Sequence, residues 1–134
     1  MYCFDTDVVS ALGGRQPPLH LVRRLSLVPV EEQFITAVTL AELLYGAERV
    51  EKTHLVERAR SHVPAAQQVL PFDEAAAEIY GPLRAGLERE GRRLDDADLM
   101  IAATVLSRDL TLVTGNVRHF GRVPGLHVEN WLES

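Results

Sequence analysis

The sequence predicts an α/β protein with a mainly parallel central sheet. Short apolar runs of strand length alternate along the chain with segments whose apolar residues recur at helical spacing. Polar residues stand at the ends of several of these runs, where a strand would give way to a helix. The 134 residues suit one domain with a real core, and we see no linker, internal repeat or low-complexity segment.

The first half of the chain predicts two strands, each followed by helices. The apolar run 1–4 ends sharply at Asp5, which indicates a buried strand that turns into a short helix. Pro18 opens a second helix because proline is tolerated in the first turn, and Pro29 closes it. The expected elements in this half are strands at 1–4 and 33–36, and helices at 8–12, between Pro18 and Pro29, at 39–49 and at 53–67.

The second half predicts three more strands and two long helices. Asp73 has the side chain of a helix N-cap, and the helix that it opens runs toward Gly91. A further helix begins at the acidic stretch 95–98 and continues as an apolar run. The expected strands in this half are 69–72, 111–114 and 126–128.

Composition excludes some classes of function. The net charge is −5, which argues against a sequence-independent nucleic-acid binder that works by bulk positive charge. It leaves room for an enzyme whose acids gather at a metal site. Cys3 is the only cysteine, so no intrachain disulfide can form and a cytoplasmic location is expected. No apolar run approaches the length of a membrane span, and no signal peptide is recognisable.

Asp98 is the most informative single residue. At roughly 100° per residue it shares a helix face with Ile101 and Val105, which should face the interior. An ionised group on that face is costly unless it is paired or binds a metal. The alternative is that Asp98 lies in the first turn and only interacts with the helix dipole, while Asp95 or Asp96 caps the helix.

Three other polar residues fall where strands end or helices begin. Asp5 follows the first strand and could cap the next helix. Glu42 could complete a capping box with Thr39, and Asn116 could be an ordinary turn residue. Because ligand sites in such sheets lie beyond the carboxyl ends of the strands, we expect these residues and Asp98 to meet at one edge.

This set of residues predicts a site for Mg²⁺ or Mn²⁺. Carboxylate and amide oxygens are hard ligands, which suit these ions better than zinc. The five histidines show no tight metal-ligand spacing, and His119 either contacts phosphate or simply packs. Glycine-rich phosphate loops, dinucleotide fingerprints and serine-nucleophile elbows are not found in the sequence.

The order of motifs resembles the PIN-domain ribonucleases, most closely the VapC-type toxins of bacterial toxin–antitoxin pairs. The resemblance rests on FDTD at 4–7, TLAELLYG at 39–46, DLMIAA at 98–103 and LVTGNVRHF at 112–120. It extends from Asp5 to Trp131. Each motif is loose by itself, and together their order and spacing are specific.

The resemblance implies a PIN-like three-layer α/β/α sandwich, with residues 1–134 forming a single PIN domain. It also implies a Mg²⁺- or Mn²⁺-dependent endoribonuclease toxin that hydrolyses RNA with metal-activated water. The family's conserved acids fall on Asp5, Glu42 and Asp98, which would hold the metal, and its fourth catalytic position falls on Asn116. The implied substrate is a tRNA or an rRNA loop. The implied partners are a second copy of the chain and a VapB-type antitoxin.

Two alternatives to a nuclease stay open at this point. A PIN-like module could bind RNA or protein without catalysis, although retention of all three acids argues against that. The run that starts at Asp5 also looks like the nucleophile motif of haloacid-dehalogenase-type phosphatases, but the only lysine, Lys52, lies on a polar helix. Four arginines are candidates for contacts with the RNA backbone, or else ordinary surface charges: Arg84, Arg92, Arg93 and Arg118.

Overall fold

A five-stranded sheet forms the centre of the computed structural model, which describes residues 1–51, 54 and 68–133. All four pairs of neighbouring strands are parallel, and the strand order is β3-β2-β1-β4-β5. The prediction of a mainly parallel sheet is therefore confirmed. The strands are β1 (Tyr2–Phe4), β2 (Gln33–Thr36), β3 (Val69–Leu70), β4 (Thr111–Val113) and β5 (His127–Glu129).

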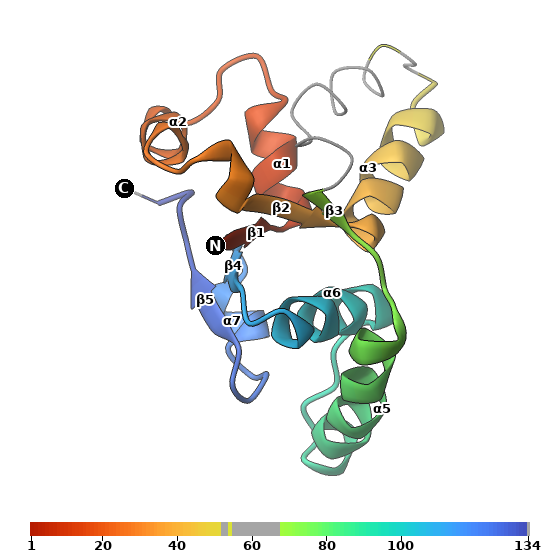
Figure 1. Cartoon of the computed structure of the whole chain (residues 1–134). Coiled ribbons are helices and arrows are strands. Elements are labelled where there is room, and N and C mark those ends of the chain that lie inside the picture. Colours follow the sequence, from red (N-terminus) through yellow and green to blue (C-terminus); the bar gives the residue numbers. More distant parts are fainter. Residues whose placement is uncertain (52–53, 55–67, 134) are drawn as a thin grey trace.

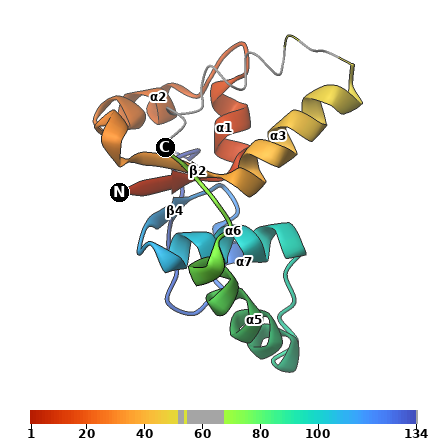
Figure 2. The ribbon, with the colours of Figure 1, turned by 45° about the vertical axis from the view of Figure 1, so that its right-hand side comes forward.

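Helices cover both faces of this sheet. The views in Figure 1 and Figure 2 agree that α1, α2 and α3 lie on one side and that α5 and α6 lie on the other. The helices are α1 (Thr6–Leu12), α2 (Leu19–Ser26), α3 (Ala37–Arg49), α5 (Glu74–Arg89), α6 (Asp96–Ser107) and α7 (Val117–Phe120), with a 3₁₀ turn, η1, at Val30–Glu32. This arrangement confirms the three-layer α/β/α sandwich.

Alternation along the strands explains why two cores form. Successive side chains of a strand point to opposite faces. Cys3 packs with the α5 and α6 side, in a cluster that includes Leu99 and Val105. Phe4, its neighbour, packs with the α1 and α2 side against Val8. Each face of the sheet therefore has its own apolar core.

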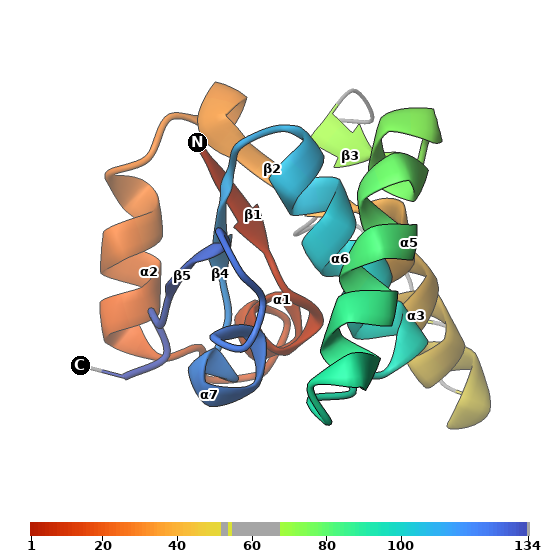
Figure 3. The same cartoon turned by 90° about the horizontal axis from the view of Figure 1, so that it is seen from below.

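The strand order places a topological switch point between β1 and β4. The chain builds β1, β2 and β3 outward in one direction and then returns to add β4 on the other side of β1. Ligands in open parallel sheets bind where two connections leave in opposite directions in this way. In Figure 3 β1 leads into α1 and β4 leads into α7 at this same edge.

Helix α3 begins earlier than the sequence predicts, which removes the expected capping box. The Thr36 hydroxyl accepts a hydrogen bond from the Thr39 backbone N–H at 3.0 Å, so the cap is Thr36 and the helix starts at Ala37. Thr39 is fully buried inside the first turn. Because the capping residue lies three positions earlier, Glu42 is too far into the helix to reach back to it and stays available for another role.

Smaller differences concern the ends of elements. The strand expected at 69–72 ends at Leu70, and the helix that Pro18 opens ends at Ser26, before Pro29. The short helix α7 was not predicted, because Asn116 resembled a turn residue. The helix expected at 53–67 falls almost entirely on residues outside those described. Among the described helices, no segment has both the length and the apolar character needed to cross a membrane.

Candidate active site

Asp5 lies at the switch point, directly after β1. Its carboxylate caps α1, accepting a hydrogen bond from the Thr6 backbone N–H at 2.8 Å through Oδ1. The second oxygen, Oδ2, accepts from the Thr114 hydroxyl at 2.8 Å, and Thr114 directly follows β4. The capping role and the site role expected for Asp5 are therefore compatible, since the two oxygens have different partners.

The loop after β4 contributes backbone as well as side chains to this edge. Asp7 accepts a hydrogen bond from the Gly115 N–H at 2.9 Å. A Cβ at Gly115 would lie 2.8 Å from that Asp7 oxygen and 2.7 Å from Leu132, so a side chain there would have to displace both. Asn116 is exposed, with its N–H donating to the Thr114 hydroxyl at 3.0 Å. Asn116 thus lies at the predicted edge, beside a partner of Asp5.

Glu42 reaches the same edge from α3. The Thr6 hydroxyl donates to its Oε1 at 2.6 Å, across a separation of 36 residues. Thr6 is also the residue whose backbone N–H binds Asp5. Glu42 and Asp5 are therefore held by one residue between them, which supports the expectation that they meet.

Asp98 lies in the first turn of α6 and is paired with a histidine. His119 Nε2 is 2.9 Å from Asp98 Oδ2, and both side chains are about three-quarters buried, at 22% and 24% exposed. Asp98 does not cap the helix, since Asp95 occupies the N-cap position without a side-chain hydrogen bond. His119 is a neighbour that the sequence left open, because the 21 intervening residues do not reveal the contact.

The surroundings of Asp5 at this edge make its carboxylate difficult to ionise. Its side chain is only 7% exposed, and burial raises its pKa from 3.8 to about 6. The hydrogen bonds from Thr114 and Thr6 oppose that rise, while the negative charges of Asp7 and Asp98 add to it. The negative charge of Asp98 is thus close enough to raise the cost of ionising Asp5. A buried acid with acidic neighbours is typical of functional sites.

The chemistry of these donors fits a hard divalent cation. Asp5, Glu42 and Asp98 offer carboxylate oxygens, and Asn116 adds an amide oxygen. Yet no three His, Cys, Asp or Glu side chains of residues 1–51, 54 and 68–133 are gathered so as to hold a metal ion. In the positions described, the three carboxylates therefore do not form a closed set of metal ligands.

The four arginines predicted to contact RNA differ in their ion pairs and in their exposure to solvent. Arg84 is engaged with Asp96 at 3.0 Å, Glu88 at 3.1 Å and the Tyr80 hydroxyl at 2.9 Å. The others are exposed: Arg92, Arg93 and Arg118. Arg93 lines a hollow of about 300 Å³ together with Asp95 and Asp96, close in sequence to Asp98.

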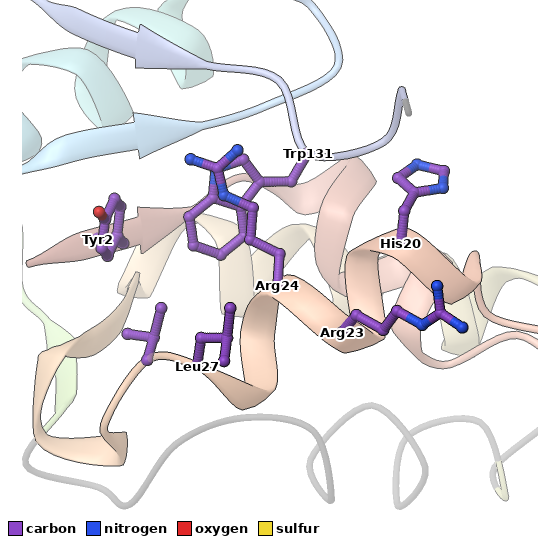
Figure 4. Close-up of a pocket in the computed structure, with 7 residues that line it drawn as sticks. Tyr2, His20, Arg23, Arg24, Leu27 and Trp131 are labelled. Atoms are coloured by element: carbon purple, nitrogen blue, oxygen red, sulfur yellow. The ribbon is translucent and has the colours of Figure 1, made fainter.

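A second, more apolar hollow lies apart from the carboxylates. It measures about 440 Å³ and is lined partly by α2 and partly by Trp131. Figure 4 shows Arg24 over the Trp131 ring, at 4.8 Å from the ring centroid. Arg24 also pairs with Glu129 at 2.6 Å, and the Trp131 indole N–H donates to the same Glu129 oxygen. None of the predicted site residues lines this hollow, so it is not the carboxylate site.

Comparison with known proteins identifies the family. The PIN domain family matches residues 2–126. A tRNA(fMet)-specific endonuclease VapC from Shigella flexneri is 44% identical over 100 residues, which cover 72% of this chain and 74% of the relative. A tRNA(fMet)-specific endonuclease VapC from Salmonella typhimurium is 38% identical over 120 residues, covering 87% and 88%.

Solved structures agree with the sequence matches. The crystal structure of DNA-bound VapBC from Salmonella typhimurium superposes with a TM-score of 0.83 at 34% identity, covering 97% of both chains. These matches decide against the phosphatase alternative, because the PIN domain family covers residues 2–126 and the relatives are named as endonucleases. They also decide against a module without catalysis, since the relatives are named as endonucleases. The chain belongs to the PIN domain family, as a ribonuclease of the VapC toxin type.

Proposed function

We propose that this ribonuclease cleaves RNA at the edge formed by Asp5, Glu42 and Asp98, and that cleavage requires Mg²⁺ or Mn²⁺. The observation that carries the proposal is Asp5. It is buried at the switch point with its pKa raised to about 6, next to further acids, and no arginine or lysine among residues 1–51, 54 and 68–133 is bonded to it. A divalent cation would supply the missing positive charge.

The residues of the edge have distinct roles in this proposal. Asp5, Glu42 and Asp98 hold the cation, and Asn116 presents an uncharged oxygen beside them. When bound there, such an ion would lower the pKa of a water molecule and offset charge on the phosphate. Thr114 and the Thr6 N–H keep the Asp5 carboxylate in one orientation, and His119 does the same for Asp98.

The substrate that we propose is a transfer RNA. The Shigella and Salmonella relatives are both named as tRNA(fMet)-specific endonucleases. The exposed arginines near the acidic edge, Arg93 and Arg118, would contact the phosphates of the RNA backbone, which position a nucleic acid without reading its sequence.

A VapB-type antitoxin is the partner that we propose, with the toxin itself forming a homodimer in the cytoplasm. The Salmonella structure is a VapBC complex bound to DNA, which supports such a partner. A basic side chain of the antitoxin could neutralise the carboxylates in place of the cation, as arginine binds carboxylates through two hydrogen bonds. Binding of the product of the neighbouring reading frame, with relief of growth arrest, would support this partner.

The metal proposal is tested by cleavage of purified tRNA with Mg²⁺, with Mn²⁺, with Ca²⁺ and with EDTA. Activity should appear with the first two ions and disappear with EDTA, while Ca²⁺ should support little turnover because its coordination is looser. The Asp98→Asn protein, purified in parallel, reports contaminating nucleases. Full cleavage in excess EDTA by the wild type, but not by this variant, would overturn the metal requirement while leaving the ribonuclease assignment intact.

A further inference from the structure

Thr6 forms hydrogen bonds with two of the candidate site carboxylates, Asp5 after β1 and Glu42 in α3. Its backbone N–H binds Asp5 Oδ1 at 2.8 Å, and its hydroxyl binds Glu42 Oε1 at 2.6 Å. The bond to Asp5 is formed by the backbone N–H, so any residue except proline could make it at this position. The bond to Glu42 requires the hydroxyl. Among the described residues, no other hydrogen bond to Glu42 is found.

The hydroxyl of Thr6 has one proton, and the geometry indicates where it goes. Glu42 Oε1 lies at 2.6 Å, whereas the Thr39 hydroxyl lies at 3.4 Å. A short contact to an ionised acceptor is the stronger bond, so Thr6 donates to Glu42. Its lone pairs are then free to accept a proton from the Thr39 hydroxyl, whose own oxygen is 3.3 Å from the Thr36 hydroxyl.

These hydroxyls form a chain that is buried at Thr36 and Thr39 and ends at the partly exposed Glu42. Thr36 and Thr39 are 1% and 0% exposed, and Thr36 is already fixed because it caps α3. Each hydroxyl can donate one proton toward the next oxygen, and such chains strengthen their members. Thr6 therefore has a defined orientation before any ion or RNA is present.

We propose that Thr6 is a positioning residue, whose hydroxyl places Glu42 beside Asp5 for divalent-cation binding. This inference rests on the proposed metal requirement and assigns a role to a residue that holds no ion itself. Without the hydroxyl, Glu42 loses the hydrogen bond that joins its carboxylate to the residue bound to Asp5. Loss of such a bond behind a metal ligand typically weakens metal binding or activity by 10- to 100-fold.

The test compares Thr6→Val, which keeps the shape and removes the hydroxyl, with Thr6→Ser, which keeps the hydroxyl. Thr104→Val is the matched control, because Thr104 is fully buried and its hydroxyl donates to the Met100 carbonyl within α6, at 2.7 Å, away from the carboxylates. Mn²⁺ binding to each full-length protein is measured by calorimetry without RNA. Thermal unfolding in EDTA reports stability, and tRNA cleavage is followed as Mg²⁺ is raised.

We expect Thr6→Val to bind Mn²⁺ about 10- to 100-fold more weakly and to regain cleavage at high Mg²⁺. Thr6→Ser and Thr104→Val should bind within about 3-fold of the wild type, and the melting temperatures of the two valine variants in EDTA should be similar. In a Glu42→Gln background the Thr6→Val change should have a much smaller effect, since Thr6 acts through Glu42.

Unchanged Mn²⁺ affinity in Thr6→Val, an equal loss in Thr104→Val, or failure of Thr6→Ser to restore binding would each overturn the role of Thr6. If Thr6→Val does not fold, Thr6→Ser and Thr6→Ala are compared in its place with the same expectations. A wild-type protein that binds no Mn²⁺ would instead overturn the metal requirement itself. The two failures are therefore distinguishable.

Discussion

Asp5 and Asp73 have the same local role and opposite electrostatic behaviour. Each caps the N-terminus of a helix, Asp5 for α1 and Asp73 for α5. The pKa of Asp5 rises to about 6, mainly because the side chain is buried. The pKa of Asp73 falls below 3.8, first because of its bond from the Ala76 N–H and then because of Arg108, which lies 3.0 Å away.

This difference shows that the backbone at a helix N-terminus determines which residue caps it. The residues packed around the capping carboxylate determine how readily that carboxylate ionises. Asp73 is partly exposed and has a cation for a partner, so ionisation stabilises the fold there. Asp5 is buried among acids without such a partner. A cap that costs stability when ionised is expected where function requires it.

The largest expected difference is in RNA cleavage. Asp5→Asn should lower cleavage at least about 100-fold, because losing a metal ligand should cost at least as much as losing a group that only orients one. Asp73→Asn should stay within about 3-fold of the wild type, since Asp73 lies outside the carboxylate edge. Initial rates on tRNA at saturating Mg²⁺ measure both. An equal loss of cleavage activity in the two variants would show that Asp5, like Asp73, affects activity only through folding.

The second largest expected effect is the pH dependence of the free energy of unfolding that Asp5 causes. Below about pH 4 Asp5 is protonated in the folded and unfolded states, and ionisation has no cost. As pH rises from about 4 to 6, the unfolded chain ionises first while folded Asp5 keeps its proton, so the free energy of unfolding falls by about 3 kcal/mol in total. Above pH 6 the difference stays constant.

Urea unfolding in EDTA at pH 4, 5, 6 and 7 measures this change. Trp131 is the only tryptophan and is buried, so its fluorescence follows unfolding. Asp5→Asn cannot ionise at this position and should gain stability relative to the wild type as pH rises. Parallel curves for the two proteins would mean that the pKa of Asp5 does not change on folding.

The ionisation of Asp73 should change the free energy of unfolding in the opposite direction from that of Asp5, and by a smaller amount. Its lowered pKa means that ionisation stabilises the fold above about pH 4, and that this contribution is lost as pH falls through the folded pKa. Asp73→Ala also removes the cap, and should lower the melting temperature at pH 7 by roughly 2–5 °C. The loss should shrink near pH 3. A loss that is independent of pH would assign the whole effect to packing.

The smallest effect concerns the ion pair of Asp73. Arg108→Ala should lower the free energy of unfolding by less than about 1 kcal/mol, because partly exposed pairs are screened by water and salt. The effect should fall as NaCl is raised to about 1 M. A loss larger than that of Asp73→Ala would show that the ion pair matters more than the cap.

The pattern of residues along the chain was enough to predict the class of fold and to select candidate site residues. Apolar period and polar strand ends were sufficient for the strands and the parallel sheet. They also marked Asp5, Glu42 and Asp98 as candidates for a site, and the family resemblance added the metal-holding role that stays a prediction. The helix expected at 53–67 lies almost entirely outside the described residues and stays a prediction. These features depend on local pattern, because a strand or helix is encoded by residues that are near each other in the chain.

Only the tertiary structure decided the partners of the acids. Thr114 reaches Asp5 across 109 residues, and Thr6 reaches Glu42 across 36. The same holds for the cap of α3, where Thr39 was expected and Thr36 was found. Local pattern cannot distinguish such alternatives, because contacts between distant residues exist only after the strands pair and the helices pack. The raised pKa of Asp5 likewise requires burial, which a sequence does not display.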